Sequence, residues 1–347
     1  MTRIFTTGAE EADPNALWSI VDFYSTHHGG QLSFGANDKI TIPPRTGRGV
    51  YQLLNQDRLT FDNTITYTEL YFGFAINCRT LGISQILYAW TDDPGVYSNF
   101  LSIRLASTGA VEVTRTATTI ATSAEGVITI GQWYYFEVWF KPLNSNGRAV
   151  VKVDGSTVID FTGDTTNEEE FINAFSFGGN SGDNAGYGGM LLDDIVVNSA
   201  DGAVNNTYPG MVRLLPIRPD STGTNSDWTR AGVDLGSDEA QLRNGTWEFA
   251  MMQTPDADDL QDAVPEIPDL PAGATITNIV LSVRAKVEAG AGVIAPLVIA
   301  NGTSDISADQ TLVSAWRYYQ YAWDVNPDDS AAWDEADLSL LKIGVSS

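Results

Sequence analysis

The strongest pattern of hydrophobic and polar positions lies between Gln132 and Phe161, where three alternating segments follow one another. Trp133–Phe140 alternates strictly, so that one face carries large apolar side chains, namely Tyr134, Phe136, Val138 and Phe140. Ala149–Val153 and Thr157–Phe161 flank Asp154-Gly155, a pair that favours the tight turn of an antiparallel hairpin. The region therefore predicts three adjacent antiparallel strands with one buried, aromatic face.

Short β-like runs also fill the rest of the first half, and Gly, Asn, Asp, Ser and Thr separate them. Helical periodicity is nearly absent there, apart from a short candidate at 167–173. The further expected strands are 31–34, 39–42, 50–54, 66–77, 83–91, 100–105, 111–116, 127–129, 174–177 and 190–197. Many short strands at this spacing are typical of two packed antiparallel sheets, so the fold class is predicted to be all-β, a jelly-roll sandwich.

The chain of 347 residues is long enough for two domains. The stretch 199–210 is rich in Gly, Asn and Asp and predicts a linker, which divides the chain into a jelly-roll domain at 1–205 and a smaller β-sandwich or jelly-roll domain at 211–347. In the second domain, 333–341 is a short helical candidate, while 219–228 is polar and 256–271 is acidic. The expected strands are 211–218, 247–252, 275–288, 293–300, 315–324 and 341–345.

The charge is strongly acidic, with 44 acidic and 19 basic side chains and a formal net charge of −25. This balance excludes nucleic acid as a partner, because phosphate binding requires clustered Lys and Arg. The acids are spread evenly: residues 206–347 carry 21 acidic and 8 basic side chains, against 23 and 11 in residues 1–205. They therefore indicate a self-repelling, solvated surface rather than an acidic tail, with attraction of metal ions as the alternative.

Cys78 is the only cysteine, so no disulfide forms within the chain, and its apolar neighbours predict a buried, unreactive thiol. The only histidines, His27 and His28, lie in a loop without a nucleophile motif. The first residues contain no apolar signal core, and no apolar run approaches the roughly 18–20 residues of a membrane span. We therefore expect synthesis in the cytoplasm without an export signal, and no membrane insertion.

Acidic side chains on strands raise the question of glycoside hydrolysis, since retaining enzymes need two carboxylates roughly 5–5.5 Å apart. The nearest candidate is Glu137, which shares a face with Trp139 but has no partner acid two or four residues away. A structural role is favoured for it. The pair Asp193 and Asp194 interrupts an apolar strand, so one carboxylate points inward and requires hydrogen bonds from N–H groups or a structural calcium ion.

Aromatic residues near loops are the best candidates for contact with a ligand, because exposed Trp and Tyr stack on sugars. They are Trp90, Tyr97 and Tyr187, the last within the glycine-rich stretch 178–189, which is itself expected to be a surface loop. The run 316–323 is aromatic on both faces and is therefore a candidate interface with a neighbouring protein. Its residues are Trp316, Tyr318, Tyr319, Tyr321 and Trp323.

The first half resembles the concanavalin A-like (laminin G-like) jelly rolls. The resemblance rests on Gln132–Phe161, on Leu192–Val197 and on Phe5–Pro14 with Trp18. The second half is similar to the domain that accompanies this module in tailed-bacteriophage virion proteins. The matching pieces are Gly210–Pro219, Asp227-Trp228, Thr275–Arg284, Asn326–Trp333 and Ile343–Val345.

The paired resemblance implies a non-enzymatic virion structural protein at the particle surface, as a capsid decoration or a tail- or fibre-associated subunit. Its expected partners are other virion proteins and further copies of itself, with host surface glycans as an additional ligand. The jelly-roll glucanases share this fold, but their Glu-x-Asp-x-x-Glu pattern is absent, so their catalytic acids are not carried over. A carbohydrate-binding adhesin is the alternative function, and a glycoside hydrolase is the less favoured one.

Overall fold

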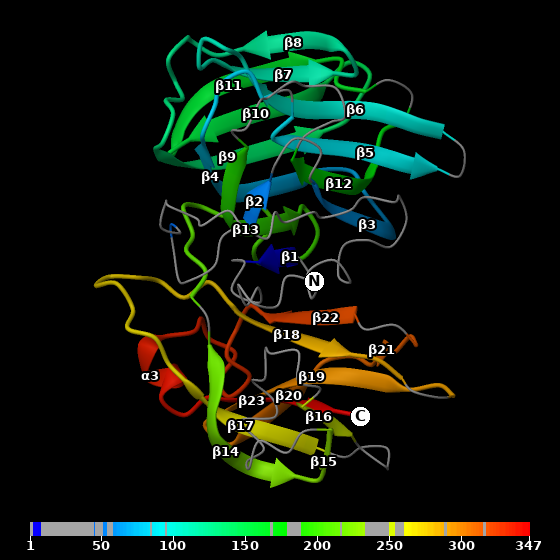
Figure 1. Ribbon diagram of the computed structural model, residues 1–347, viewed down its shortest axis with the longest axis vertical. Helices are drawn as coiled ribbons and strands as arrows, with labels where there is room; N and C mark the ends of the chain where they lie inside the picture. Colours follow the sequence, from blue (N-terminus) through cyan, green and yellow to red (C-terminus); the bar gives the residue numbers. More distant parts are fainter. Residues whose placement is uncertain are drawn as a thin grey trace. The chain divides into compact units, whose positions relative to one another are not determined.

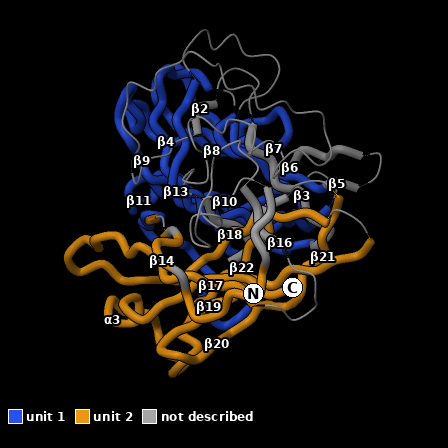
Figure 2. The backbone as a smooth tube through the Cα atoms, turned by 60° about the horizontal axis from the view of Figure 1, so that its bottom comes forward, with its two compact units in different colours: residues 1–11, 24–214 blue, residues 12–23, 215–347 orange. Residues whose placement is uncertain are grey.

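The computed structural model describes residues 3–7, 45, 51–53, 58–83, 85–93, 96–166, 169–178, 189–215, 217–232, 250–253, 260–287, 290–314 and 317–347. These residues form antiparallel strands and one helix of four residues, so the prediction of an all-β fold is confirmed (Figure 1). Within this part of the chain, residues 3–214 form one compact unit, unit 1, and residues 217–347 form a second, unit 2 (Figure 2). No helix among the described residues is long and apolar enough to cross a membrane.

Unit 1 consists of two antiparallel sheets. Sheet A has the order β1-β13-β4-β9-β10-β11, with β2 also paired to β13. Its strands are β1 (Arg3–Thr7), β2 (Tyr51–Leu53), β4 (Leu70–Cys78), β9 (Trp133–Lys141), β10 (Gly147–Val153), β11 (Ser156–Gly163) and β13 (Met190–Ser199). Sheet B has the order β3-β12-β5-β6-β7-β8. Its strands are β3 (Arg58–Tyr67), β5 (Leu87–Asp93), β6 (Val96–Leu105), β7 (Val111–Arg115), β8 (Thr118–Thr122) and β12 (Ile172–Gly178).

Aromatic rings from both sheets form the core of unit 1. Phe72 of β4 lies edge-on to Phe175 of β12, with ring centroids 5.3 Å apart, and Phe74 lies 5.0 Å from Phe177. All four side chains are at most 1% exposed. The contact defines one inward face for each sheet and, because side chains alternate along a strand, it also defines the face that points away from the core.

The meander predicted at 132–161 is confirmed as β9, β10 and β11. Phe136, Val138 and Phe140 are fully buried on the inward face. Asp154 and Gly155 both have positive φ, +48° and +78°, which is the geometry that the two-residue turn of a twisted hairpin requires. The aspartate Oδ1 also accepts a hydrogen bond of 2.8 Å from the backbone N–H of Tyr135. The turn is thus tied back to the strand that opens the meander.

Unit 2 contains sheet C, of order β14-β17-β23-β19-β20 with β21 paired to β19, and two pairs, β18-β22 and β15-β16. The strands are β14 (Arg218–Ser226), β15 (Thr229–Gly232), β16 (Ala250–Gln253), β17 (Leu260–Glu266), β18 (Ile279–Ala285), β19 (Val293–Ala300), β20 (Thr303–Ile306), β21 (Gln310–Thr311), β22 (Arg317–Trp323) and β23 (Lys342–Ser346). Helix α3 (Glu335–Leu338) begins with a capping box between Asp334 and Asp337.

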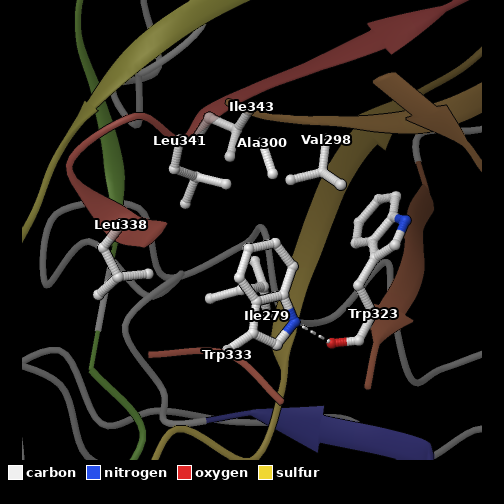
Figure 3. Close-up of a cluster of buried hydrophobic side chains, with 8 residues drawn as sticks. All are labelled: Ile279, Val298, Ala300, Trp323, Trp333, Leu338, Leu341 and Ile343. Carbon is white, nitrogen blue, oxygen red and sulfur yellow. Dashed lines mark hydrogen bonds between the residues drawn. The ribbon is translucent and has the colours of Figure 1, made fainter. Parts of the chain in front are cut away.

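Trp333 lies in the middle of the hydrophobic core of unit 2 (Figure 3). Its indole is 3% exposed, and its Nε1–H donates a 2.9 Å hydrogen bond to the backbone carbonyl of Trp323. The buried side chains around it come from four strands and the segment of α3: Ile279, Val298, Ala300, Trp323, Leu338, Leu341 and Ile343. The core of unit 2 is therefore built largely from the last seventy residues of the chain.

Several expected elements differ from those observed. Residues 127–129 and 211–215 are irregular, and 219–226, part of the polar stretch for which no strand was expected, belong to strand β14. The helix expected at 167–173 is absent from its described residues, 169–173, because β12 begins at Ile172. The helix expected at 333–341 exists as the shorter α3. The strands expected at 31–34 and 39–42, and His27 and His28, lie outside the described residues.

Cys78 is fully buried at the end of β4, as its neighbours predicted. Burial raises the pKa of its thiol to about 12, since the low-dielectric surroundings disfavour the thiolate. The group is therefore protonated at neutral pH and serves as a small apolar side chain.

Candidate functional site

The outward face of sheet A is covered by a segment of the chain itself. We call this segment, residues 207–214, the strap; it follows β13 and carries no regular structure. The ring of Tyr208 lies edge-on to Tyr71, with centroids 5.3 Å apart, and 6.5 Å from Trp139. Lys152 Nζ lies 3.5 Å from the centroid of the Tyr208 ring on its face. Two aromatic side chains and one cation therefore hold the strap over β4, β9 and β10.

Gly73 in β4 is required where the strap approaches the sheet. A Cβ atom at this position would overlap the hydroxyl of Tyr135 and lie 3.0 Å from Cγ of Pro209. A side chain here would force the strap and Tyr135 apart. Sequence reasoning did not single out this glycine, because a glycine inside a strand carries no sign of what approaches it.

Glu137 anchors the strap. Its carboxylate oxygen Oε1 accepts a 2.9 Å hydrogen bond from the backbone N–H of Gly210, and the residue is 4% exposed. The neighbouring Tyr135 is 1% exposed, and burial, together with the charge of Asp194, raises the pKa of its hydroxyl far above the usual value. Glu137 therefore takes the structural role that the sequence favoured, since its carboxylate binds the backbone of the strap.

Asp193 and Asp194 bind the same segment through Arg45. The guanidinium Nη1 of Arg45 lies 2.5 Å from Asp194 Oδ2 and donates a 2.8 Å hydrogen bond to the carbonyl of Val212. The backbone N–H of Arg45 donates to Asp193 Oδ2 at 3.0 Å, and that of Leu214 donates to Asp194 Oδ1 at 2.8 Å. Both aspartates are fully buried. Each carboxylate is thus bound by N–H groups, and Asp194 is neutralised by a guanidinium.

The sequence also allowed a structural calcium ion at Asp193 and Asp194. No group of three or more His, Cys, Asp or Glu side chains that could hold a metal ion occurs among the described residues. Calcium at Asp193 and Asp194 therefore stays a prediction, beside the hydrogen bonds that the structure gives these carboxylates. Arg45 is the residue that sequence reasoning missed, since it precedes Asp193 by 148 positions and lies in no motif.

The outward face of sheet B differs in character from that of sheet A, and we call it the polar face. Residues that stand directly opposite one another on neighbouring strands share a face of an antiparallel sheet. One such row crosses β12, β5, β6, β7 and β8 in register, and every member carries a hydroxyl group: Ser176, Tyr88, Ser102, Thr114 and Thr119. Ser102 Oγ and Thr114 Oγ1 share a buried hydrogen bond of 2.5 Å, which confirms that these side chains lie on one side.

Trp90 stands on the polar face next to this row. The partners of Phe175 and Phe177 in β5 are Ala89 and Leu87, which face the core, so the alternating Tyr88 and Trp90 face away from it. Their rings lie 5.0 Å apart with an interplanar angle of 38°. Trp90 is 6% exposed, whereas Tyr88 is half-buried. Of the three residues predicted to contact a ligand, Trp90 thus lies on an outward face of a sheet, but little of its side chain is exposed. The side chain of Tyr97 and all of Tyr187 lie outside the described residues.

An ion pair stands on the same face one row further along β6 and β7. Arg104 Nε lies 2.5 Å from Glu112 Oε2, and Arg104 Nη2 donates a 3.0 Å hydrogen bond to Thr119 Oγ1. The side chains of Arg104 and Glu112 are 36% and 18% exposed, and Thr119 is exposed. Sequence reasoning did not find this pair, because its two members become neighbours only through the register of the hairpin.

Two of the aromatic residues in β22 that were predicted to contact a neighbouring protein are buried in the core of their own unit. Tyr319 and Trp323 are 8% and 3% exposed and belong to the hydrophobic core of unit 2, and Tyr321 packs against the same core. Their partners in β18 are Val283, Leu281 and Ile279, which are also apolar. Tyr319 and Trp323 are thus covered by their own unit and offer no surface to a neighbour, whereas the interface role of the half-buried Tyr321 stays a prediction. Trp316 and the side chain of Tyr318 lie outside the described residues.

No protein-family model matches the chain, and no curated protein matches it. Solved structures similar to it include alginate lyase Aly36B, at 17% identity and a TM-score of 0.30, over 44% of this chain and 81% of that one. An endo-β-1,4-glucuronan lyase from the fungus Trichoderma reesei has 16% identity and a TM-score of 0.34, over 45% and 77%. A Trypanosoma rangeli sialidase has 14% identity and a TM-score of 0.32, over 43% of this chain and only 25% of the sialidase.

These similarities correct one expectation from the sequence. The absence of a recognised catalytic set led to the prediction that the protein is not an enzyme, and the similar structures are two lyases and a sialidase. Absence of the glucanase acids is thus no ground for excluding activity. At identities of 14–17% and TM-scores of 0.30–0.34, the similarity assigns neither a reaction nor a catalytic residue to this chain.

Proposed function

We propose that the protein binds carbohydrate and that the polar face of sheet B makes the contact. The observation that carries the proposal is the hydroxyl row across β12, β5, β6, β7 and β8, which includes the half-buried Tyr88. Hydroxyl groups both donate and accept hydrogen bonds, as sugar hydroxyls do, and an aromatic ring packs on the apolar face of a pyranose. Since Ser102, Thr114 and Ser176 are at most 5% exposed, the direct contacts fall to Tyr88, Arg104, Glu112 and Thr119.

The two outward faces of unit 1 support this choice by contrast. The strap lies on the outward face of sheet A and binds the carboxylates of Glu137 and Asp194 and the ring of Tyr71. On the polar face of sheet B, the charged and hydroxyl side chains Arg104, Glu112 and Thr119 retain exposure. A saccharide therefore finds partly exposed donors and acceptors on sheet B, whereas on sheet A the strap covers β4 and β9, and the partly exposed Arg148 and the exposed Asp160 form an ion pair.

Replacement of Tyr88 by alanine tests the proposal. On an array of immobilised oligosaccharides, the unaltered protein is expected to bind at least one glycan, and Tyr88→Ala is expected to weaken that binding about tenfold, the effect of one lost aromatic contact. Tyr208→Ala is the matched control, because it removes an equally half-buried tyrosine from the covered face of sheet A. Failure of the unaltered protein to bind any glycan contradicts the proposal, as does an equal loss in both variants.

We also propose that the protein is displayed on a tailed-bacteriophage particle, docked to capsid or tail proteins. The support is the pairing of two sets of motifs along one chain; the motif strands at 133–161, 192–197 and 279–284 are regular elements of the two units. Mass spectrometry of purified virions is expected to detect the protein in stoichiometric amounts. If the protein is absent from virions and free in the host cytosol, this proposal is contradicted, while the proposal of carbohydrate binding is not affected.

A further inference from the structure

The ion pair on the polar face of sheet B limits which saccharides this face accepts. Arg104 and Glu112 are direct partners across β6 and β7, and the guanidinium already uses Nε for the carboxylate and Nη2 for Thr119. A sugar carboxylate is bound best by a guanidinium that offers two parallel N–H groups, as in bidentate Arg–carboxylate pairs. Here Glu112 occupies the Nε position from within the protein, and its negative charge stands where a sugar carboxylate would approach.

The charge of the whole chain acts in the same direction. With 44 acidic and 19 basic side chains, the protein carries a formal net charge of −25, so its long-range field repels polyanions. Among the described side chains of the hydroxyl row and its neighbouring pair, one cation and one anion balance each other. A polyuronate chain approaching this face therefore meets repulsion at long range and an already paired guanidinium at contact.

An uncharged saccharide meets neither obstacle. The remaining N–H groups of Arg104 donate to sugar hydroxyls, and the carboxylate of Glu112 accepts from a neighbouring hydroxyl, so the pair suits two adjacent hydroxyls of one ring. Hydrogen bonds to charged groups are about twice as strong as those between neutral groups, which lets one exposed pair contribute measurably. Thr119, exposed beside Arg104, adds a further hydroxyl at the edge strand β8.

We propose that the polar face of sheet B selects uncharged saccharides and that Glu112 is the specificity-determining residue. The inference rests on the proposed carbohydrate binding and adds the chemical class of the ligand. Glu112 neutralises the charge of Arg104 and occupies its Nε–H, so the pair disfavours carboxylated sugars. Removal of its charge leaves Arg104 available to a uronate, so the preference is expected to shift toward acidic glycans.

The test compares neutral polysaccharides with the same polysaccharides oxidised at C6 to uronates, for β-1,4-glucan, β-1,3-glucan and β-1,4-mannan. The unaltered protein is expected to bind the neutral member of at least one pair about tenfold more tightly than its oxidised form at low salt. In Glu112→Gln this ratio is expected to fall about tenfold. Glu125→Gln is the matched control, since Glu125 is an exposed loop residue and its loss changes the net charge equally.

The outcomes separate the two proposals. If the oxidised form binds the unaltered protein as tightly as the neutral form, the inference on specificity is overturned while carbohydrate binding stands. If no member of any pair binds, both proposals are overturned. If Glu112→Gln and Glu125→Gln change the ratio equally, the effect belongs to net charge and Glu112 has no specific role. Circular dichroism of both variants confirms that each is folded before the ratio is compared.

Discussion

Replacement of Arg45 by methionine is expected to lower the free energy of unfolding of unit 1 by about 3–5 kcal/mol, the effect of removing one partner of a buried ion pair. Asp194 is fully buried, and its pairing with Arg45 at 2.5 Å is the charge interaction that compensates its desolvation. Methionine keeps much of the apolar volume of the side chain but removes the guanidinium from the buried carboxylate, which keeps its hydrogen bond from the N–H of Leu214. Calorimetric or urea unfolding of the purified variant measures the loss.

Two further variants make this result specific. Arg148→Met removes the guanidinium from a solvent-exposed pair with Asp160, whose side chains are 29% and 58% exposed, and is expected to cost at most about 1 kcal/mol. The double variant Arg45→Met/Asp194→Asn removes both charges and is expected to recover part of the loss, because the side chain at position 194 is then neutral and no longer requires the guanidinium. Asparagine is suitable at position 194, where φ is +50°. Equal losses in Arg45→Met and Arg148→Met would contradict the role of this pair.

The meander at 132–161 could be predicted because its information is local. Strict alternation fixed the two faces of Trp133–Phe140, and Asp154-Gly155 supplied the only turn compatible with the twist of the hairpin. Strands at the edge of a sheet show a weaker pattern of alternating apolar and polar side chains. Strand β14 (Arg218–Ser226) is polar, and no strand was expected over most of it, but it lies at the edge of sheet C, where only one side needs a hydrogen-bonded partner.

In the strap, by contrast, a strand was predicted where the structure has none. Residues 211–218 are mostly apolar and therefore predicted a strand, yet up to Leu215 they are irregular. Their backbone groups are bound by side chains instead: Asp194 accepts from Leu214, and the carbonyl of Val212 accepts from Arg45. A short apolar run predicts a strand, but it does not report whether another strand or a side chain satisfies the backbone.

The candidate site was only partly accessible from the sequence for a similar reason. Trp90 was selected as an aromatic residue near a loop, and it does lie on the polar face. The hydroxyl row and the pair of Arg104 with Glu112 depend on the registers of β12, β5, β6, β7 and β8 together. Serine and threonine are common on solvated strands, so no single strand distinguishes them. Only the order of the strands in the sheet aligns them.

Replacement of Trp333 by alanine is expected to lower the free energy of unfolding of unit 2 by about 3–5 kcal/mol, the usual effect of truncating a large buried aromatic side chain. The indole is 3% exposed and contacts side chains from β18, β19, β22 and β23, so the cavity would lie in the middle of the core (Figure 3). Leu340→Ala is the control, because Leu340 is 55% exposed and its truncation is expected to change stability by no more than about 0.5 kcal/mol.

The two stability variants together test whether the units are independent. The core around Trp333 and the ion pair of Arg45 belong to different compact units, so scanning calorimetry of Trp333→Ala is expected to lower the transition of unit 2 and leave that of unit 1 unchanged. Arg45→Met is expected to do the reverse. Trp333→Phe separates packing from hydrogen bonding, since it retains a ring but leaves the carbonyl of Trp323 without its indole donor, at an expected loss of about 1–3 kcal/mol. A single transition that falls equally in Trp333→Ala and Arg45→Met would contradict independence, because a defect in one unit would then be transmitted in full to the other.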